Sequence, residues 1–218
     1  MGGSVPDELK GFRGPHPIKA MLVVVIIVAI QIALPHEVTP GPAWLIIFVE
    51  LSGIPIVFIS RTMGIVATKR FRYVMNVYFF LLICSGAANA FLLLVAALDD
   101  SASSGIALLF AGFGVLAISV LTFGLIYWWI DGGGPLRRME GTVTQWDFQF
   151  PQQQALVEEW QPTLFDYLYV AYTNILAFSP TDAMPLTHRV KLLFTVQSAI
   201  SVLTVVVTVG HAINVIAN

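Results

Sequence analysis

The sequence predicts an all-α, polytopic membrane helix bundle, and three observations support this. Of its 218 residues, 57% are hydrophobic and only 11% are charged, whereas charged residues make up about a quarter of ordinary soluble domains. Apolar runs long enough to cross a bilayer core about 30 Å thick recur along the chain. The basic residues fall in the connections on one side of these runs. No sizeable soluble domain is therefore expected.

Five apolar runs are predicted to be transmembrane helices, because each approaches or exceeds the length of about 20 residues that a bilayer requires. The first four form a transmembrane region at 1–130. Their polar residues Gln31, Asn76 and Asn89 are expected to form hydrogen bonds between helices. The five runs lie at 18–34, 42–60, 73–98, 105–130 and 190–216.

Glu50 lies near the middle of the second run. A charged group at that depth is costly, so an ionisable residue there is a candidate functional site, here an intramembrane acid. The alternative is a structural role, in which a protonated Glu50 donates a hydrogen bond to a neighbouring helix.

The segment 131–162 is predicted to be an interfacial loop rich in aromatic residues. Trp146, Phe148 and Phe150 alternate with polar residues, and a period of two predicts a short strand with one apolar face. We expect this loop to lie on the membrane surface and to cover the mouth of the segment that follows. The alternative is a linker that its aromatic residues pin to the membrane.

The segment 163–218 combines a short apolar stretch, a polar turn and a long apolar helix. Asp166, Leu168 and Tyr169 precede Pro185 and Thr187 at a spacing that resembles the pore helix and inner helix of two-transmembrane potassium channels, in the pore-loop superfamily. This resemblance covers about the last quarter of the chain. It implies a pore constriction at Ala177, Phe178, Ser179, Pro180, Thr181 and Asp182.

The predicted constriction differs from a potassium filter, whose backbone carbonyls face the ion and whose glycines adopt dihedrals that other residues rarely reach. Neither glycine is present here. Pro180 fixes its own φ and drives Ser179 toward extended conformations. We therefore predict that the chain does not select potassium and that Phe178 could act as a hydrophobic gate.

The basic residues also predict how the chain crosses the membrane, because Lys and Arg are retained on the cytoplasmic side. If 163–187 enters and leaves on one side, all 11 basic residues share one face. This predicts five transmembrane helices plus a re-entrant pore-like helix in the cell (inner or plasma) membrane, with a cytoplasmic N-terminus. The alternative is six spans, in which 163–180 crosses and leaves Arg189 and Lys191 outside.

Polar residues recur along the last helix at spacings of three and four, so they share one face. Such a stripe is typical of an inner helix that lines a water-filled path. It is also typical of hydroxyl groups that pack between membrane helices. The candidate pore-lining residues are Ser198, Ser201, Thr204, Thr208 and His211.

Together these patterns predict an oligomeric pathway for ions or small solutes that is not selective for potassium. The resemblance implies a homo-tetramer in membrane lipid, with a monovalent cation as the candidate permeant. The alternative is a non-conducting scaffold that retains the pore-loop fold and docks a partner through 131–162. The sequence has no phosphate-binding glycine motif, paired-histidine metal motif or nucleophile elbow, so we expect no enzyme, metal or cofactor. A net charge of −2 gives no basis for binding nucleic acid.

Overall fold

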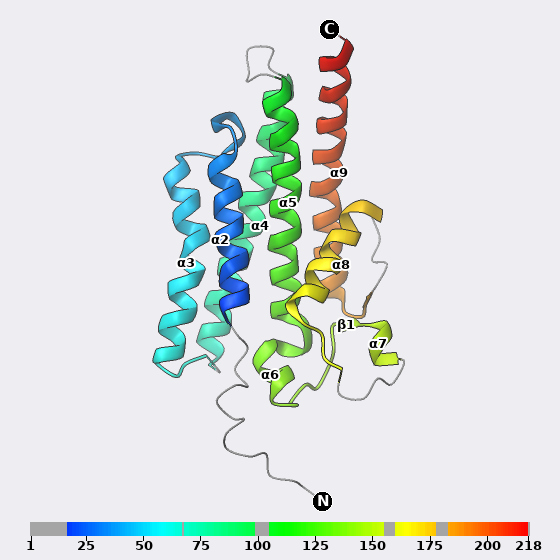
Figure 1. The fold of residues 1–218 in the computed structure, drawn as a ribbon. Coiled ribbons are helices and arrows are strands. Elements are labelled where there is room, and N and C mark those ends of the chain that lie inside the picture. Colours follow the sequence, from blue (N-terminus) through cyan, green and yellow to red (C-terminus); the bar gives the residue numbers. More distant parts are fainter. Residues whose placement is uncertain (1–16, 67, 99–104, 155–159, 178–182, 218) are drawn as a thin grey trace, which may run out of the picture.

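The computed structural model describes residues 17–66, 68–98, 105–154, 160–177 and 183–217. Figure 1 shows long helices side by side, with a shorter helix against them. Four of the long helices have the length and composition to cross a membrane, and α2 is a shorter apolar helix. The chain is therefore a polytopic all-α membrane bundle. The long helices are α2 (Pro17–Ala33), α3 (Ala43–Thr62), α4 (Lys69–Leu98), α5 (Gly105–Ile130) and α9 (His188–Ala217).

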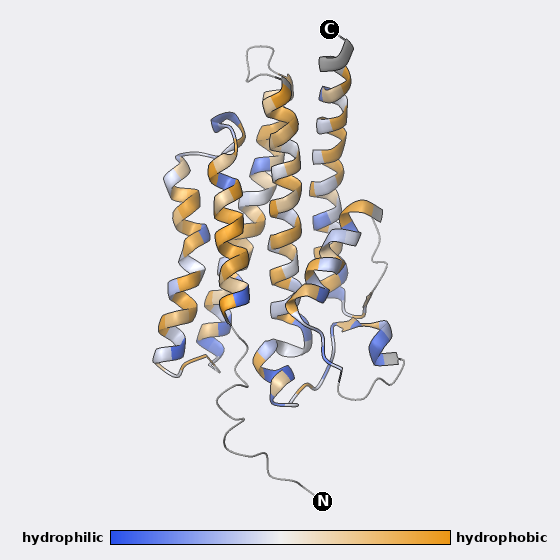
Figure 2. Cartoon of the chain, viewed as in Figure 1, coloured by the Kyte–Doolittle hydropathy of each residue, from blue (hydrophilic) through white to orange (hydrophobic). Residues whose placement is uncertain are grey.

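The surface of the bundle is apolar along its middle. Figure 2 shows hydrophobic residues along most of each long helix and hydrophilic residues toward the ends. Large side chains such as Phe48, Phe80 and Phe110 are exposed on the outside. Exposed apolar surface on this scale is unusual for a protein in water and suits contact with lipid.

The short elements gather mostly at one end of the bundle. Among the described short elements, η1 (His36–Val38) lies at the opposite end, between α2 and α3. The strands β1 and β2 pair antiparallel, with Phe148 opposite Pro185 and Gln149 opposite Met184. The strand predicted from the aromatic alternation is thus confirmed at β1. The elements of this end are η2 (Asp131–Gly133), α6 (Pro135–Met139), β1 (Phe148–Gln149), α7 (Pro151–Gln154), α8 (Leu164–Ala177) and β2 (Met184–Pro185).

Three consecutive glycines end α5 and turn the chain. Gly132, Gly133 and Gly134 have φ values of 59°, 81° and 104°, which side chains with a Cβ rarely adopt. Pro135 then begins α6, where its missing N–H costs nothing. This turn brings the loop back under the bundle.

Polar side chains join the helices as the sequence predicts. Asn89 in α4 donates to the side-chain oxygen of Gln31 in α2 at 2.7 Å. The indole of Trp129 donates to Asn76 at 3.2 Å. Glycine allows the closest packing, because a Cβ on Gly112 would lie 2.0 Å from the hydroxyl of Thr208 in α9.

Candidate functional site

The helix α8 and strand β2 form a hairpin that begins and ends at the same end of the bundle (Figure 1). With 14 residues, α8 is about 21 Å long at 1.5 Å per residue, shorter than the 30 Å core of a bilayer. The pairing of β2 with β1 then returns the chain to the end where α5 stops. This geometry agrees with the predicted re-entrant path.

A capping interaction fixes the start of α8. The carboxylate of Asp166 accepts hydrogen bonds from the backbone N–H and the hydroxyl of Thr163, both at 2.7 Å. These bonds satisfy groups that would otherwise be unpaired at a helix N-terminus. Asp166, which the resemblance placed on a pore helix, therefore has a local structural role in this chain.

Asp131 is the centre of a buried polar network beneath the hairpin. Its side chain is 0% exposed. One carboxyl oxygen accepts from the backbone N–H groups of Asp147 at 2.8 Å and Phe148 at 3.2 Å. The other accepts from the hydroxyl of Tyr167 in α8 at 2.5 Å. A single carboxylate therefore links the end of α5, the loop and α8.

Arg138 closes the same network from α6. Its guanidinium donates to the backbone carbonyl of Asp131 at 2.5 Å and to that of Trp128 at 2.9 Å. Its Cζ also lies 5.2 Å from the centre of the Tyr167 ring, which is within the range of a cation–π interaction. Arg138 is 4% exposed, so its donors are committed to the protein.

Asp147 joins the loop to the start of α9. Its buried carboxylate forms an ion pair with Arg189, whose Nε donates at 2.7 Å. The hydroxyl of Thr187 donates to the same carboxylate at 2.7 Å. The backbone carbonyl of Asp147 accepts from the N–H of Leu186 at 2.8 Å. We call Asp131, Arg138, Asp147, Tyr167 and Arg189 the clamp.

Aromatic residues of the loop pack next to the clamp. Phe148 and Phe150 are both 0% exposed. Phe148 contacts the rings of Tyr127, Tyr167 and Phe194 at centroid distances of 5.3, 5.7 and 5.9 Å. The loop thus covers the base of the hairpin, and its buried aromatics hold α5, α8 and α9 together.

A second polar cluster lies deeper, where α5, α8 and α9 meet. The side-chain oxygen of Gln197 accepts from the Tyr127 hydroxyl at 2.6 Å and from Asn174 at 2.9 Å. The amide nitrogen of Gln197 donates to the backbone carbonyl of Ala171 at 2.9 Å. Ser198 donates weakly to Asn174 at 3.4 Å. Gln197 is 0% exposed, so it links the three helices.

The other candidate pore-lining residues also face the interior of the chain. Ser201 and Thr204 are fully buried and Thr208 nearly so. Each donates its hydroxyl to the carbonyl four residues earlier on α9, at 2.7 to 2.8 Å. His211 is half-buried, and its Nε2 has no hydrogen-bond partner among the described residues. Their role in lining a path remains a prediction.

The predicted constriction lies largely beyond what the structure describes. Ala177 is the last residue of α8. Phe178, Ser179, Pro180, Thr181 and Asp182 lie outside the described residues.

Glu50 is buried in α3 and is 2% exposed. Its Oε2 has no hydrogen-bond partner in the described part of the chain. Its backbone carbonyl accepts from the Tyr78 hydroxyl at 2.8 Å. A Cβ on Gly53 would lie 2.5 Å from the Tyr78 ring, so α3 and α4 approach closely here. Glu50 lies apart from the clamp, on another pair of helices.

Sequence reasoning missed the clamp and the cluster at Gln197. The sequence assigned no role to Asp131 and Asp147 within the predicted loop, and it used Arg138 and Arg189 only as basic residues that indicate the topology. One feature of the sequence did point to the clamp. Asp147 lies within the segment of alternating aromatic residues, and the aromatic residues of that segment nearest to it in the strand are buried. The partners of a buried carboxylate, however, are distant in sequence and become adjacent only in the fold.

These features define the class of protein, a multi-pass α-helical membrane protein with a clamped hairpin. No group of three or more potential metal ligands occurs within the described residues. The chain matches no protein-family profile, no curated protein and no solved structure.

Proposed function

We propose that the chain is a non-conducting membrane scaffold that keeps a pore-loop-like hairpin as a rigid packing unit. The observation that supports this most strongly is the orientation of α9. Its polar residues, including Ser201 and Thr204, are buried within a single chain. Its outward face is apolar, with Leu192, Val202 and Val206 exposed. A path lined by α9 between copies would present this apolar face to water, at a high cost in hydration.

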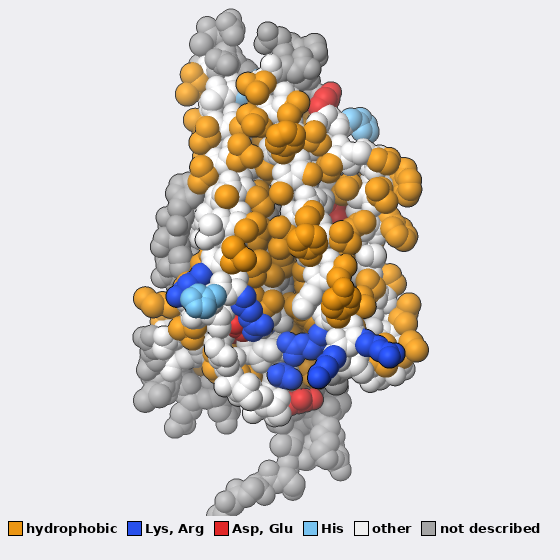
Figure 3. Space-filling view, turned by 180° about the vertical axis from the view of Figure 1, so that it is seen from behind, with side chains coloured by type: hydrophobic (Ala, Val, Ile, Leu, Met, Phe, Trp, Pro, Cys, Tyr) orange, Lys and Arg blue, Asp and Glu red, His pale blue; other side chains and the backbone are white. Residues whose placement is uncertain are grey.

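The proposed topology has five spans and a hairpin inserted from the cytoplasmic side of the cell membrane. The described basic residues support it, because they gather at the end of the bundle that holds the loop (Figure 3). Basic residues mark the cytoplasmic side, so the N-terminus lies inside. The residues concerned are Lys19, Arg61, Lys69, Arg70, Arg72, Arg137, Arg138, Arg189 and Lys191.

A scaffold needs a surface for its partner, and the loop offers one. Its aromatic residues Phe148 and Phe150 are committed to the interior. Met139, Glu140 and Gln145 are exposed on the same loop. We propose that a cytoplasmic partner docks on the segment 139–145, which the clamp holds in place.

The second candidate is an oligomeric pathway for ions or small solutes, and one feature of α8 favours it. Phe165, Tyr169, Tyr172 and Leu176 form an exposed face of this short helix. In a tetramer this face would contact neighbouring copies, and the hairpin tips would approach the symmetry axis. The constriction would then be formed by Phe178 and its neighbours.

Flux through liposomes separates the two candidates. Purified protein is reconstituted, and the passage of monovalent cations, anions and small solutes is measured at both polarities and at several pH values. The scaffold predicts no flux above that of empty liposomes, for the natural chain and for Phe178→Ala. Gramicidin added to the same liposomes shows that they report conduction.

Flux by the natural chain that rises in Phe178→Ala would contradict the scaffold. A matched pair would then locate the path, because Thr204 and Val206 lie on opposite faces of α9. Reduced flux in Thr204→Val, with Val206→Thr unchanged, would indicate a path along the buried stripe.

A further inference from the structure

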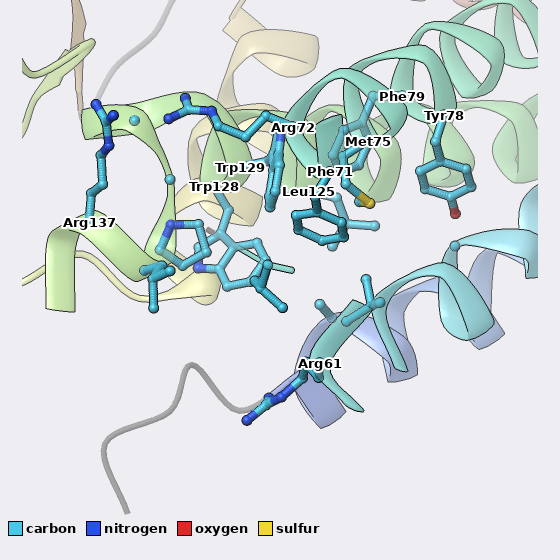
Figure 4. Close-up of a pocket in the computed structure, with 18 of the residues that line it drawn as sticks. Arg61, Phe71, Arg72, Met75, Tyr78, Phe79, Leu125, Trp128, Trp129 and Arg137 are labelled. Atoms are coloured by element: carbon cyan, nitrogen blue, oxygen red, sulfur yellow. The ribbon is translucent and has the colours of Figure 1, made fainter. Parts of the chain in front are cut away.

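A cavity of about 420 Å³ lies between α2, α3, α4 and the turn from α5 into α6 (Figure 4). Its volume is within the range of small-molecule sites. Most of its wall is apolar or aromatic, and includes Val24, Val57, Phe71, Met75, Phe79 and Trp128. It lies outside the hairpin and the clamp, on the N-terminal half of the bundle.

The cavity has an end at Tyr78 and a basic end (Figure 4). The ring of Tyr78 lies close to Gly53. Arg61, Arg72 and Arg137 lie at the opposite end. From Phe71 to Phe79 the wall follows eight residues of α4, about 12 Å at 1.5 Å per residue. The shape is therefore a narrow apolar slot that ends among guanidinium groups.

Two of these guanidinium groups have no acceptor among the described residues. Neither Arg72 nor Arg137 forms a side-chain hydrogen bond or ion pair within the part of the chain that the structure describes. They lie near enough for their positive charges to repel. Figure 4 shows both guanidinium groups turned toward the same corner, with Arg61 across the cavity. Glu140 is the one carboxylate among the described lining residues, and it forms no ion pair with either arginine.

The two ends together specify an amphiphile with a negative charge. An apolar slot favours a hydrocarbon chain, and paired guanidinium groups favour the oxygens of a phosphate. Basic pockets between membrane helices on the cytoplasmic side are typical sites for anionic lipid headgroups. Trp128 and Trp129 also line the cavity, and their rings suit the membrane interface.

We propose that this cavity holds an acyl chain of an anionic phospholipid, whose phosphate binds Arg72 and Arg137. The proposal does not depend on the function of the hairpin, because no residue of α8 or α9 lines the cavity. Bound lipid would contact α2, α3, α4 and α6 at once.

The test is lipid retention by the full-length chain in detergent, measured by native mass spectrometry. The probes are phosphatidylglycerol, phosphatidylcholine with the same acyl chains, and inorganic phosphate. We expect phosphatidylglycerol to be retained at least 10-fold more strongly than phosphatidylcholine, and inorganic phosphate not to be retained. The double variant Arg72→Gln, Arg137→Gln is expected to bind phosphatidylglycerol roughly 30-fold more weakly, at about 1 kcal/mol for each basic residue.

The matched control is Arg70→Gln, which removes a charge from the same turn of α4 but does not line the cavity. It should retain phosphatidylglycerol like the natural chain. A second variant, Val57→Trp, fills the slot without changing charge and should also lose the lipid. Its folding is checked by its thermal transition, and Ile54→Phe replaces it if that transition is lost.

Three results would overturn the proposal. Equal retention of the two phospholipids would remove the role of the headgroup charge. An equal loss in Arg70→Gln and in the double variant would indicate general attraction to a basic surface. Binding of inorganic phosphate as strong as that of phosphatidylglycerol would indicate an anion site that needs no acyl chain.

Discussion

Two regions at the same end of the bundle use arginine in opposite ways. At the hairpin, Arg138 and Arg189 donate to protein acceptors, among them the buried carboxylate of Asp147. At the cavity, Arg72 and Arg137 have no acceptor within the described residues. All four satisfy the same rule of membrane topology. Their surroundings, and not their positions along the chain, separate an arginine that stabilises the fold from one that can bind a ligand.

The difference follows from the neighbours of each region. The hairpin side encloses its polar groups, so each buried carboxylate needs donors, and the clamp supplies them. The cavity side is lined mostly by apolar and aromatic residues, which cannot accept strong hydrogen bonds from guanidinium groups, and its one described carboxylate, Glu140, forms no ion pair with Arg72 or Arg137. Substitutions in the two regions should therefore affect different properties, stability in the first and lipid binding in the second.

The largest effect is expected for Asp131→Ala. It leaves two backbone N–H groups and the Tyr167 hydroxyl without their acceptor. We expect a loss of roughly 3–5 kcal/mol in the free energy of unfolding, typical of breaking a buried charged network. The measurement is an unfolding titration with denaturing detergent in mixed micelles. Glu140→Ala, on an exposed part of the loop, is the control and should change stability by less than about 0.5 kcal/mol. Equal losses of stability in Asp131→Ala and Glu140→Ala would mean that the clamp does not hold the loop.

A smaller effect is expected for Arg189→Ala, compared with Arg72→Ala. Removing Arg189 leaves the buried Asp147 with Thr187 as its remaining side-chain donor. Because Arg189 is itself more than half exposed, we expect a loss of about 2 kcal/mol. Arg72→Ala removes no side-chain hydrogen bond or ion pair to the described residues and should leave lipid-free stability unchanged. A destabilisation by Arg72→Ala as large as that by Arg189→Ala would contradict the contrast between the two regions.

The smallest effect is expected for Thr204→Val. Its hydroxyl donates to the carbonyl of Ile200 on its own helix, and valine has nearly the same shape. We expect a change of less than about 1 kcal/mol in unfolding free energy. Gln197→Leu is the contrasting variant, because it removes the acceptor of the Tyr127 hydroxyl and the nearer of the two acceptors of the Asn174 amide. A larger loss of unfolding free energy for Thr204→Val than for Gln197→Leu would show that the polar stripe of α9 does more than pack between helices.

Composition and charge were sufficient to predict the class of fold. Hydrophobic runs identified the long helices, whereas the re-entrant path that the basic residues indicate stays a prediction. The aromatic alternation predicted a short strand with one apolar face, and in the structure Phe148 and Phe150 on that segment are buried. The prediction of the long helices succeeds because lipid imposes length and polarity on each segment independently of its neighbours.

The clamp and the cavity could not be predicted in the same way. The donors to Asp131 come from residues 16, 17 and 36 positions away, and no periodicity relates them. The cavity is lined by residues from α2, α3, α4, α5 and α6, which are far apart in the sequence. The sequence shows the stripe of polar residues on α9. Which part of the protein this stripe faces depends on how α5 and α8 pack against α9.

The claim on which the account depends most is that the hairpin returns to the end where it began. Single cysteines at Glu140, His188 and His36 test it in a Cys84→Ala background, with a membrane-impermeant thiol reagent on oriented vesicles. All three positions are exposed, and His36 lies in η1, between the C-terminal end of α2 and the start of α3. We predict that positions 140 and 188 react from the same side and that position 36 reacts from the other. Labelling of position 188 together with position 36, with position 140 on the opposite side, would contradict the re-entrant path.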